Sequence, residues 1–170
     1  PHRRQTRAHH RGRWQVVETD GHCRGHLCLY DAARRLLISG DQVLPSISPN
    51  VSVLSAAPEA DPLREFLASL QRLGDCHPDT LVLPSHGRPF RGLHRRVADL
   101  TAHHQQQLEA LREFCGEPRT AFDVLPTMFR RVPRGFHRLL AIGEAVAHLN
   151  YLRGRGQVVR SVDHAGIVRF

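Results

Sequence analysis

Three side chains of metal-ligating type follow short apolar runs in this chain of 170 residues: His22, Asp41 and His86. Imidazole nitrogens and carboxylate oxygens are ligands that zinc accepts at neutral pH. An apolar strand that ends in glycine or proline before such a side chain keeps it out of the core and fixes its position. These residues form a candidate metal site. Histidines at strand ends also serve as caps, so the spacing alone leaves both interpretations open.

The expected strands are the apolar runs at residues 14–17, 27–30, 36–38 and 80–83. The first two flank a glycine-containing loop that carries His22. The third leads through Gly40 to Asp41, and the fourth leads through a proline to His86. Each candidate ligand is therefore predicted at the mouth of a strand.

A helix is expected between the third and fourth strands, after a proline- and serine-containing loop. Asp61 is the predicted N-cap, Pro62 suits the first helical position, and Gly74 ends the pattern. One apolar face contains Leu63, Phe66, Leu67, Leu70 and Leu73. The order strand, strand, strand, helix, strand predicts an α/β layer pair.

From residue 93 onward the pattern is mainly helical. We expect a long helix over residues 93–115, a short helix capped by Thr120, and a further helix over residues 136–154. His104 is expected to be packed and His148 to lie on a polar helix face. Two short strands over residues 158–162 and 167–170 would complete a compact winged-helix unit.

Three motifs follow one another along the chain. Residues 19–26 read Thr-Asp-Gly-His-Cys-Arg-Gly-His, residues 39–41 read Ser-Gly-Asp, and residues 84–87 read Pro-Ser-His-Gly. In this order they resemble the Thr-Pro-Gly-His-Thr/Ser-Pro-Gly-His, Ser-Gly-Asp and Pro-Gly-His-Gly segments of the metallo-β-lactamase superfamily. The resemblance is to its glyoxalase II-like hydrolases with a C-terminal winged-helix domain. One segment alone is weak support, whereas three in sequence are strong.

The resemblance implies an α/β fold, with the C-terminal half of an αββα sandwich over residues 14–92. A connecting helix over residues 93–115 and a winged-helix-like domain over residues 116–170 would follow. The family site holds two zinc ions. The resemblance implies that His22 binds the first and His86 the second, that Asp41 bridges them with catalytic effect, and that a hydroxide between the metals is the nucleophile. It makes His26 a supporting residue outside the ligand set.

The chain also departs from the family pattern. Asp20 stands in place of a proline, Cys23 and Arg24 replace Thr/Ser-Pro, and Ser85 replaces a glycine. The family's upstream His-x-His-x-Asp-His segment, which supplies four ligands, is absent from these residues. The resemblance therefore implies the C-terminal portion of such an enzyme, with at most one zinc ion and little hydrolase activity.

Two functions follow from these observations. The first is a zinc-dependent hydrolase of a thioester, another ester or a phosphodiester, with a small molecule or RNA as substrate. The alternative is a non-catalytic module that binds nucleic acid or protein through the winged helix. Its candidate phosphate contacts are Arg130, Arg131, Arg134 and Arg138. We favour the interpretation in which these arginines solvate a domain that shapes the substrate groove. DNA is therefore not expected as a partner, and self-association stays open.

Composition limits the class of protein further. Five of the eight excess positive charges precede the first acidic residue, so we expect residues 1–13 to form a disordered basic tail.

Every apolar run is shorter than the roughly 20 residues that a membrane span requires. No apolar signal core follows the basic N-terminus. The four cysteines form no Cys-x-x-Cys pair, which favours free thiols in the cytoplasm.

Overall fold

A computed structural model describes residues 5–9 and 12–170, which form two compact units. The first unit combines the described residues of Pro1–Pro49 with Glu65–Thr101. The second combines Asn50–Arg64 with Ala102–Phe170. The second unit therefore includes a segment from the middle of the chain, which the expected domain boundaries did not include.

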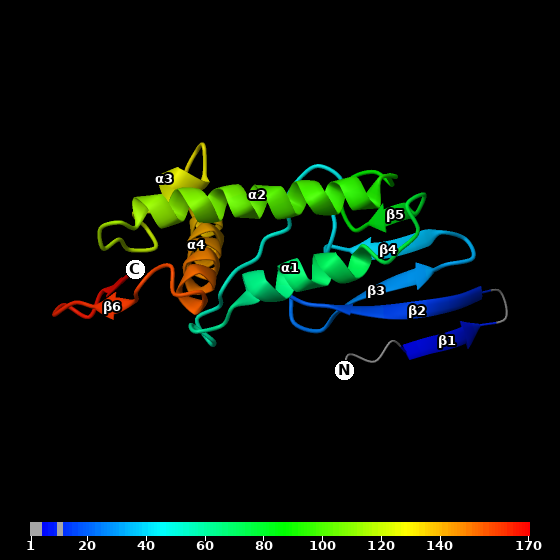
Figure 1. Ribbon diagram of the computed structural model, residues 1–170, viewed down its shortest axis with the longest axis horizontal. Helices are drawn as coiled ribbons and strands as arrows, with labels where there is room; N and C mark the ends of the chain where they lie inside the picture. The colour runs from blue at the N-terminus through cyan, green and yellow to red at the C-terminus, as the bar shows by residue number, and fades with distance from the viewer. Residues whose placement is uncertain (1–4, 10–11) are drawn as a thin grey trace. The chain divides into compact units, whose positions relative to one another are not determined.

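The first unit contains a five-stranded sheet in the order β1-β2-β3-β4-β5 (Figure 1). Its strands are Gln5–His9, Gly12–Thr19, His26–Asp31, Leu36–Gly40 and Leu81–Pro84. The first three pairings are antiparallel, and β4 pairs with β5 in parallel. Helix α1, Pro62–Leu73, lies between β4 and β5 in the chain. The four predicted strands and the predicted helix are thus confirmed.

Strand β1 corrects the expectation that residues 1–13 form a disordered tail. Gln5 pairs with Val16, and His9 pairs with Gly12. Residues 1–4 and 10–11 of the expected tail lie outside the described residues. Main-chain hydrogen bonds hold an edge strand whatever the charge of its side chains, and charged residues are common on such edges. The basic composition therefore does not exclude strand formation.

Alternate residues of the sheet are buried, as period-2 strands require. The buried face contains Val17, Cys28, Tyr30, Leu37 and Val82. On the opposite face Leu27 is 54% exposed and Ile38 is 38% exposed. Apolar side chains therefore lie on both faces of the sheet, although within the described residues only one face is fully buried.

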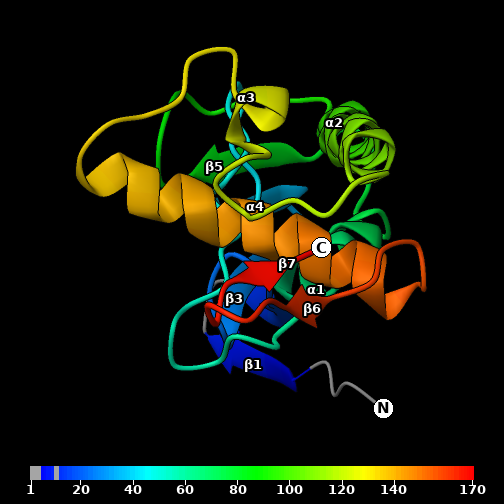
Figure 2. The same cartoon turned by 90° about the vertical axis from the view of Figure 1, so that its left-hand side faces the viewer.

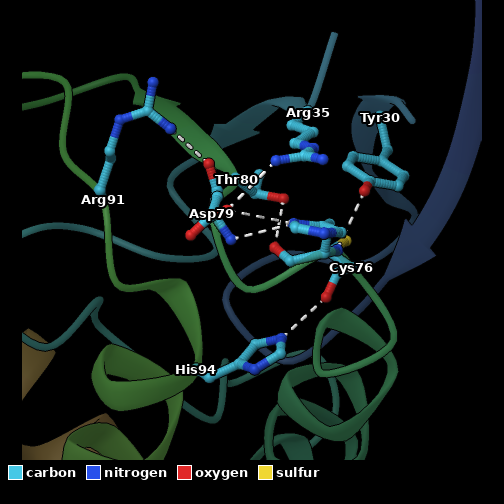
Figure 3. A network of polar contacts seen from close by, with 8 residues as sticks. Tyr30, Arg35, Cys76, Asp79, Thr80, Arg91 and His94 are labelled. Carbon is cyan, nitrogen blue, oxygen red and sulfur yellow. Dashed lines mark hydrogen bonds and ion pairs between the residues drawn. The ribbon is translucent and has the colours of Figure 1, made fainter. Parts of the chain in front are cut away.

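A polar network surrounds the connection from α1 to β5 (Figure 3). Arg35 binds the carboxylate of Asp79 at 3.1 Å, and its carbonyl oxygen accepts the main-chain N–H of Leu81. The Tyr30 hydroxyl accepts the main-chain N–H of His77. The side chain of Thr80 donates to the carbonyl of His77. Arg35, just before β4, is therefore bonded to residues at the start of β5. These bonds fix where the parallel pairing of the two strands begins.

The second unit contains the later part of α2, Leu93–Phe114, then α3, Leu125–Met128, and α4, Phe136–Gly154. Strands β6, Ser161–Val162, and β7, Val168–Arg169, form an antiparallel hairpin (Figure 2). The expected short helix begins later than predicted, because Thr120 exchanges hydrogen bonds with Asp123 in a turn. The winged-helix assignment stays a prediction. None of the helices in the described ranges is long and apolar enough to cross a membrane.

Helix α4 buries polar side chains that the sequence pattern placed outside. His148 is fully buried, which corrects its expected position on a polar face, and the expected packing of His104 is confirmed. His148 Nε2 lies 3.1 Å from His104 Nδ1, and its Nδ1 lies 2.8 Å from the carbonyl oxygen of Glu144. The reason for the burial is that partners are available on both sides of the imidazole.

This buried pair predicts a loss of stability in acid. Burial lowers the pKa of His104 to about 3 and that of His148 to about 4. The unfolded chain binds protons near pH 6.5, whereas the folded chain does so only near pH 4 and below. The free energy of unfolding should therefore fall as the pH falls from 6.5 to 4, by about 1.4 kcal/mol per pH unit for each histidine.

Glu144 opposes this effect, because burial raises its pKa to about 7. Its contribution to stability is lost as the pH rises from 4.5 to 7. Urea unfolding across this range should give a shallower dependence on pH for His148→Gln and a steeper one for Glu144→Gln. An unchanged dependence in both variants would contradict the assignment.

Candidate functional site

Two of the three candidate ligands lie just after strands, and the third lies on a loop between two strands. His22 is on the loop between β2 and β3, Asp41 follows β4, and His86 follows β5. Because β4 and β5 are parallel, their carboxyl ends lie at the same edge of the sheet. The main-chain N–H of Ser85 donates to the carbonyl of Gly40 at 3.0 Å, which joins the two ends directly.

Asp41 lies between the two histidines. His22 Nε2 is 3.7 Å from Asp41 Oδ2, and His86 Nε2 is 3.6 Å from Asp41 Oδ1. Each carboxylate oxygen thus faces a different imidazole nitrogen. The carboxylate and the two imidazoles are donors that would be able to hold a cation.

The surroundings of the Asp41 Oδ1 atom indicate whether His22, Asp41 and His86 fit a metal ion. It is a buried oxygen that accepts no hydrogen bond from any described residue. Buried carboxylate oxygens are costly unless they are hydrogen-bonded or coordinate a cation. Imidazole nitrogen and carboxylate oxygen also match zinc in type. The residues present therefore fit zinc.

The same residues do not complete a coordination shell. Among residues 5–9 and 12–170, no group of three or more His, Cys, Asp or Glu side chains is close enough to hold a metal ion. The distances above agree with this absence, because His22 lies near one oxygen of Asp41 and His86 lies near the other. His86 is also the most accessible of the three, with 72% of its side chain exposed. A structural zinc needs four ligands, so further donors are required.

His26 lies beside the candidate site without belonging to the ligand pairs. Its Nδ1 lies 2.8 Å from the hydroxyl oxygen of buried Thr19. On the other side its ring packs against Gly40, where a Cβ atom would lie 2.4 Å from its Nε2. Burial and the neighbouring His22 lower its pKa. This placement is consistent with the predicted supporting role.

Cysteine does not contribute to the site. Cys23, beside His22, is exposed, and within the described part of the chain no cluster of three metal-ligating side chains forms around it. Cys28 is buried beneath the same loop, and burial raises the pKa of its thiol to about 12. It is therefore a protonated core side chain at neutral pH.

The four predicted phosphate-contacting arginines lie in the second unit, around the start of α4. Arg130, Arg131 and Arg134 are exposed, whereas Arg138 is half-buried. Arg138 donates to the carbonyl of Pro133 and lies 6.0 Å from the centre of the Phe122 ring. The arginines are gathered on one segment.

One contact near the site was not predicted from the sequence. The loop of His22 rests on α1, where a Cβ atom on Gly21 would lie 2.4 to 2.5 Å from atoms of Phe66. Buried Ser69, one turn further on, contacts Asp20. A serine within the apolar face of α1 was the available signal, because a buried hydroxyl requires a partner.

Comparisons with known proteins identify the family of this chain. The family model described as the metallo-beta-lactamase superfamily matches residues 1–86. The model described as the metallo-beta-lactamase-like, C-terminal domain matches residues 108–170. No curated protein matches the chain.

Two solved structures are similar over nearly the whole chain. A beta-lactamase domain protein from Burkholderia ambifaria is 45% identical over 99% of this chain, with a TM-score of 0.94. A metallo-beta-lactamase family protein from Thermus thermophilus is 34% identical over 99%, with a TM-score of 0.83. The chain spans 50% and 52% of these two proteins, respectively. It belongs to the metallo-beta-lactamase superfamily.

The packing of His26 on Gly40 gives a prediction for Gly40→Ala. Gly40 has a φ of +54°, and a new Cβ would collide with the imidazole. Gly156 is a matched control, since its φ is +69° and its Cβ would meet nothing within 4 Å. In urea unfolding, Gly156→Ala should cost about 1 kcal/mol from backbone strain. Gly40→Ala should cost about 1 kcal/mol more from overpacking. Equal losses would show that His26 does not contact this glycine.

Proposed function

We propose that this chain supplies His22, Asp41 and His86 to the metal centre of a zinc-dependent hydrolase. The observation that carries the proposal is the carboxylate of Asp41. Its two oxygens face one histidine each, and within the described part of the chain Oδ1 accepts no hydrogen bond. The match to the superfamily model over residues 1–86 supports metal-dependent hydrolysis as the reaction class.

Zinc, when bound, supplies a Lewis acid and lowers the pKa of a bound water from about 15.7 to about 7. The chain's own residues would hold it. His22 and His86 supply neutral nitrogens, and Asp41 supplies negative charge that offsets the cation. His26, held between Thr19 and Gly40, limits the movement of the Asp41 loop.

The chemistry that zinc supplies determines which substrates we propose. A centre that activates water and polarises an oxygen cleaves thioesters, other esters or phosphodiesters, so we propose a small ester or thioester, or RNA, as substrate. We also propose a cytoplasmic location, which agrees with the free thiols of Cys23, Cys28 and Cys115.

The chain by itself should bind at most one zinc ion, because among residues 5–9 and 12–170 no group of three or more metal-ligating side chains comes together. Titration against a chromophoric chelator should show this stoichiometry. Asp41→Asn should weaken binding at least about tenfold, since it removes the charge at the shared ligand. His164→Ala, in the exposed β6–β7 turn, is the control and should bind normally. Two tightly bound zinc ions per chain, together with thioester turnover, would contradict the limit of one zinc ion, and no zinc binding at all would contradict the proposal.

A second candidate function is supported by the surface of the second unit. Between Val124 and Gly143 there are four arginines and no acidic residue. In the same segment Phe136 is 70% exposed and Leu139 is 65% exposed. Exposed aromatic rings among arginines suit single-stranded nucleic acid, because bases stack on rings and phosphates pair with guanidinium groups. We therefore propose RNA binding by this segment as the alternative.

This alternative predicts salt-dependent binding of a labelled oligouridylate, measured by fluorescence anisotropy. The double variant Arg131→Ala, Arg134→Ala should bind more weakly. Its log–log salt dependence should be shallower by about 0.7 for each phosphate that an arginine no longer neutralises. Arg95→Ala, an exposed arginine of the first unit, is the control. Equal binding of the double variant would exclude this segment, and duplex DNA binding that survives moderate salt would overturn the preference for RNA.

A further inference from the structure

Ser69 of α1 links that helix to the loop of His22. It is fully buried, and its hydroxyl oxygen accepts the main-chain N–H of Asp20 at 2.9 Å. The same oxygen lies 3.2 Å from the carbonyl oxygen of Asp20 and 2.8 Å from that of Glu65, either of which can accept its proton. Both main-chain polar groups of Asp20 thus meet one side chain, two residues before the proposed ligand.

Arg72 strengthens this link. One guanidinium nitrogen donates to the Ser69 hydroxyl at 2.8 Å, and Nε donates to the carbonyl of Glu18 at 3.2 Å. Ser69 and Arg72 lie one turn apart on α1. Together they hold the end of β2 against the helix just before the chain turns into the His22 loop.

Two further contacts restrain the loop itself. The Asp20 carboxylate accepts the main-chain N–H of Gly25 at 2.8 Å, which closes the turn around His22. Gly21, with a φ of +103°, packs so closely on Phe66 that only a glycine fits. The loop therefore has a fixed path over α1, and the position of His22 follows from that path.

The loop is also joined to the second ligand. Gln42, fully buried and adjacent to Asp41, donates from Nε2 to the carbonyl of Asp20 at 3.4 Å. Asp20 consequently receives contacts from α1 and from the segment after β4. These contacts relate the His22 loop to Asp41, although none of them touches a ligand atom.

We propose that Ser69 is a positioning residue for the metal centre, acting through Asp20 to set the distance from the His22 imidazole to Asp41. This rests on the proposed function, because the position of His22 matters for binding only if it is a ligand. Removing the hydroxyl leaves the buried N–H of Asp20 without its acceptor, and the loop should then lose its fixed path.

The test is zinc affinity in a double-mutant cycle. Ser69→Ala should weaken zinc binding about tenfold, as substitutions behind metal ligands commonly do. The loss should disappear in the His22→Ala background and persist in the His86→Ala background, because the hydroxyl acts through His22 alone. A general loss of packing would instead affect both backgrounds equally, and that result would overturn the proposal.

Thr80→Ala is the matched control. Thr80 is a fully buried residue of the same unit, and its hydroxyl donates within the α1–β5 connection (Figure 3). It should lower the free energy of unfolding by a similar amount without the His22-dependent change in zinc affinity. An equal, His22-dependent loss in Thr80→Ala would overturn the proposal.

Amide hydrogen exchange of the metal-free protein separates this inference from the proposed function. The main-chain N–H groups from Asp20 to Gly25 should exchange faster in Ser69→Ala and at an unchanged rate in Thr80→Ala. If the unmodified chain binds no zinc but this difference is found, the proposed function fails and Ser69 still positions the loop. If zinc binds through His22 and Ser69→Ala changes neither affinity nor exchange, the positioning role is wrong.

Discussion

The candidate site depends on the parallel pairing of β4 with β5. The register pairs Leu36 with Leu81 and Gly40 with Pro84, so both strands end at one edge. A slip of one residue would turn alternate side chains to the opposite face of the sheet. The ligands that follow these strands would then separate. The pairing is secured at its start by Arg35 and Asp79, and at its end by the bond from Ser85 to Gly40.

This constraint explains how much could be predicted from the sequence. Apolar runs that end in glycine or proline place Asp41 and His86 at strand ends, and the caps of α1 fix its limits at Pro62 and Leu73. Strand β1 could not be predicted in the same way. It is held by main-chain pairing to β2, whereas its own sequence, Gln-Thr-Arg-Ala-His, has no alternating apolar pattern.

Contacts between layers explain what the sequence could not show. A serine among the apolar residues of α1 gives no indication that it bonds to Asp20, which lies 49 positions away. Helix α4 presents the same difficulty, because Glu144, His148 and Asn150 suggest a solvated face. The segment before α1 supplies partners for two of them: Asn50 donates to Glu144, and Asn150 donates to the carbonyls of Pro58 and Ala60. A partner of His148 is His104 of α2. Burial was possible because each polar group has a partner.

The geometry around Asp41 also sets a limit on what these residues can do alone. Asp41 forms one nitrogen–oxygen pair with His22 and another with His86. A metal ion held by either pair would have two protein ligands, whereas zinc commonly takes four. With so few ligands, affinity depends strongly on how well each is held in place before the metal arrives. Two sets of contacts hold them: His26 packs against Gly40, and α1 holds the loop of His22 through Asp20. His86, with 72% of its side chain exposed, is the candidate ligand whose position packing restrains least.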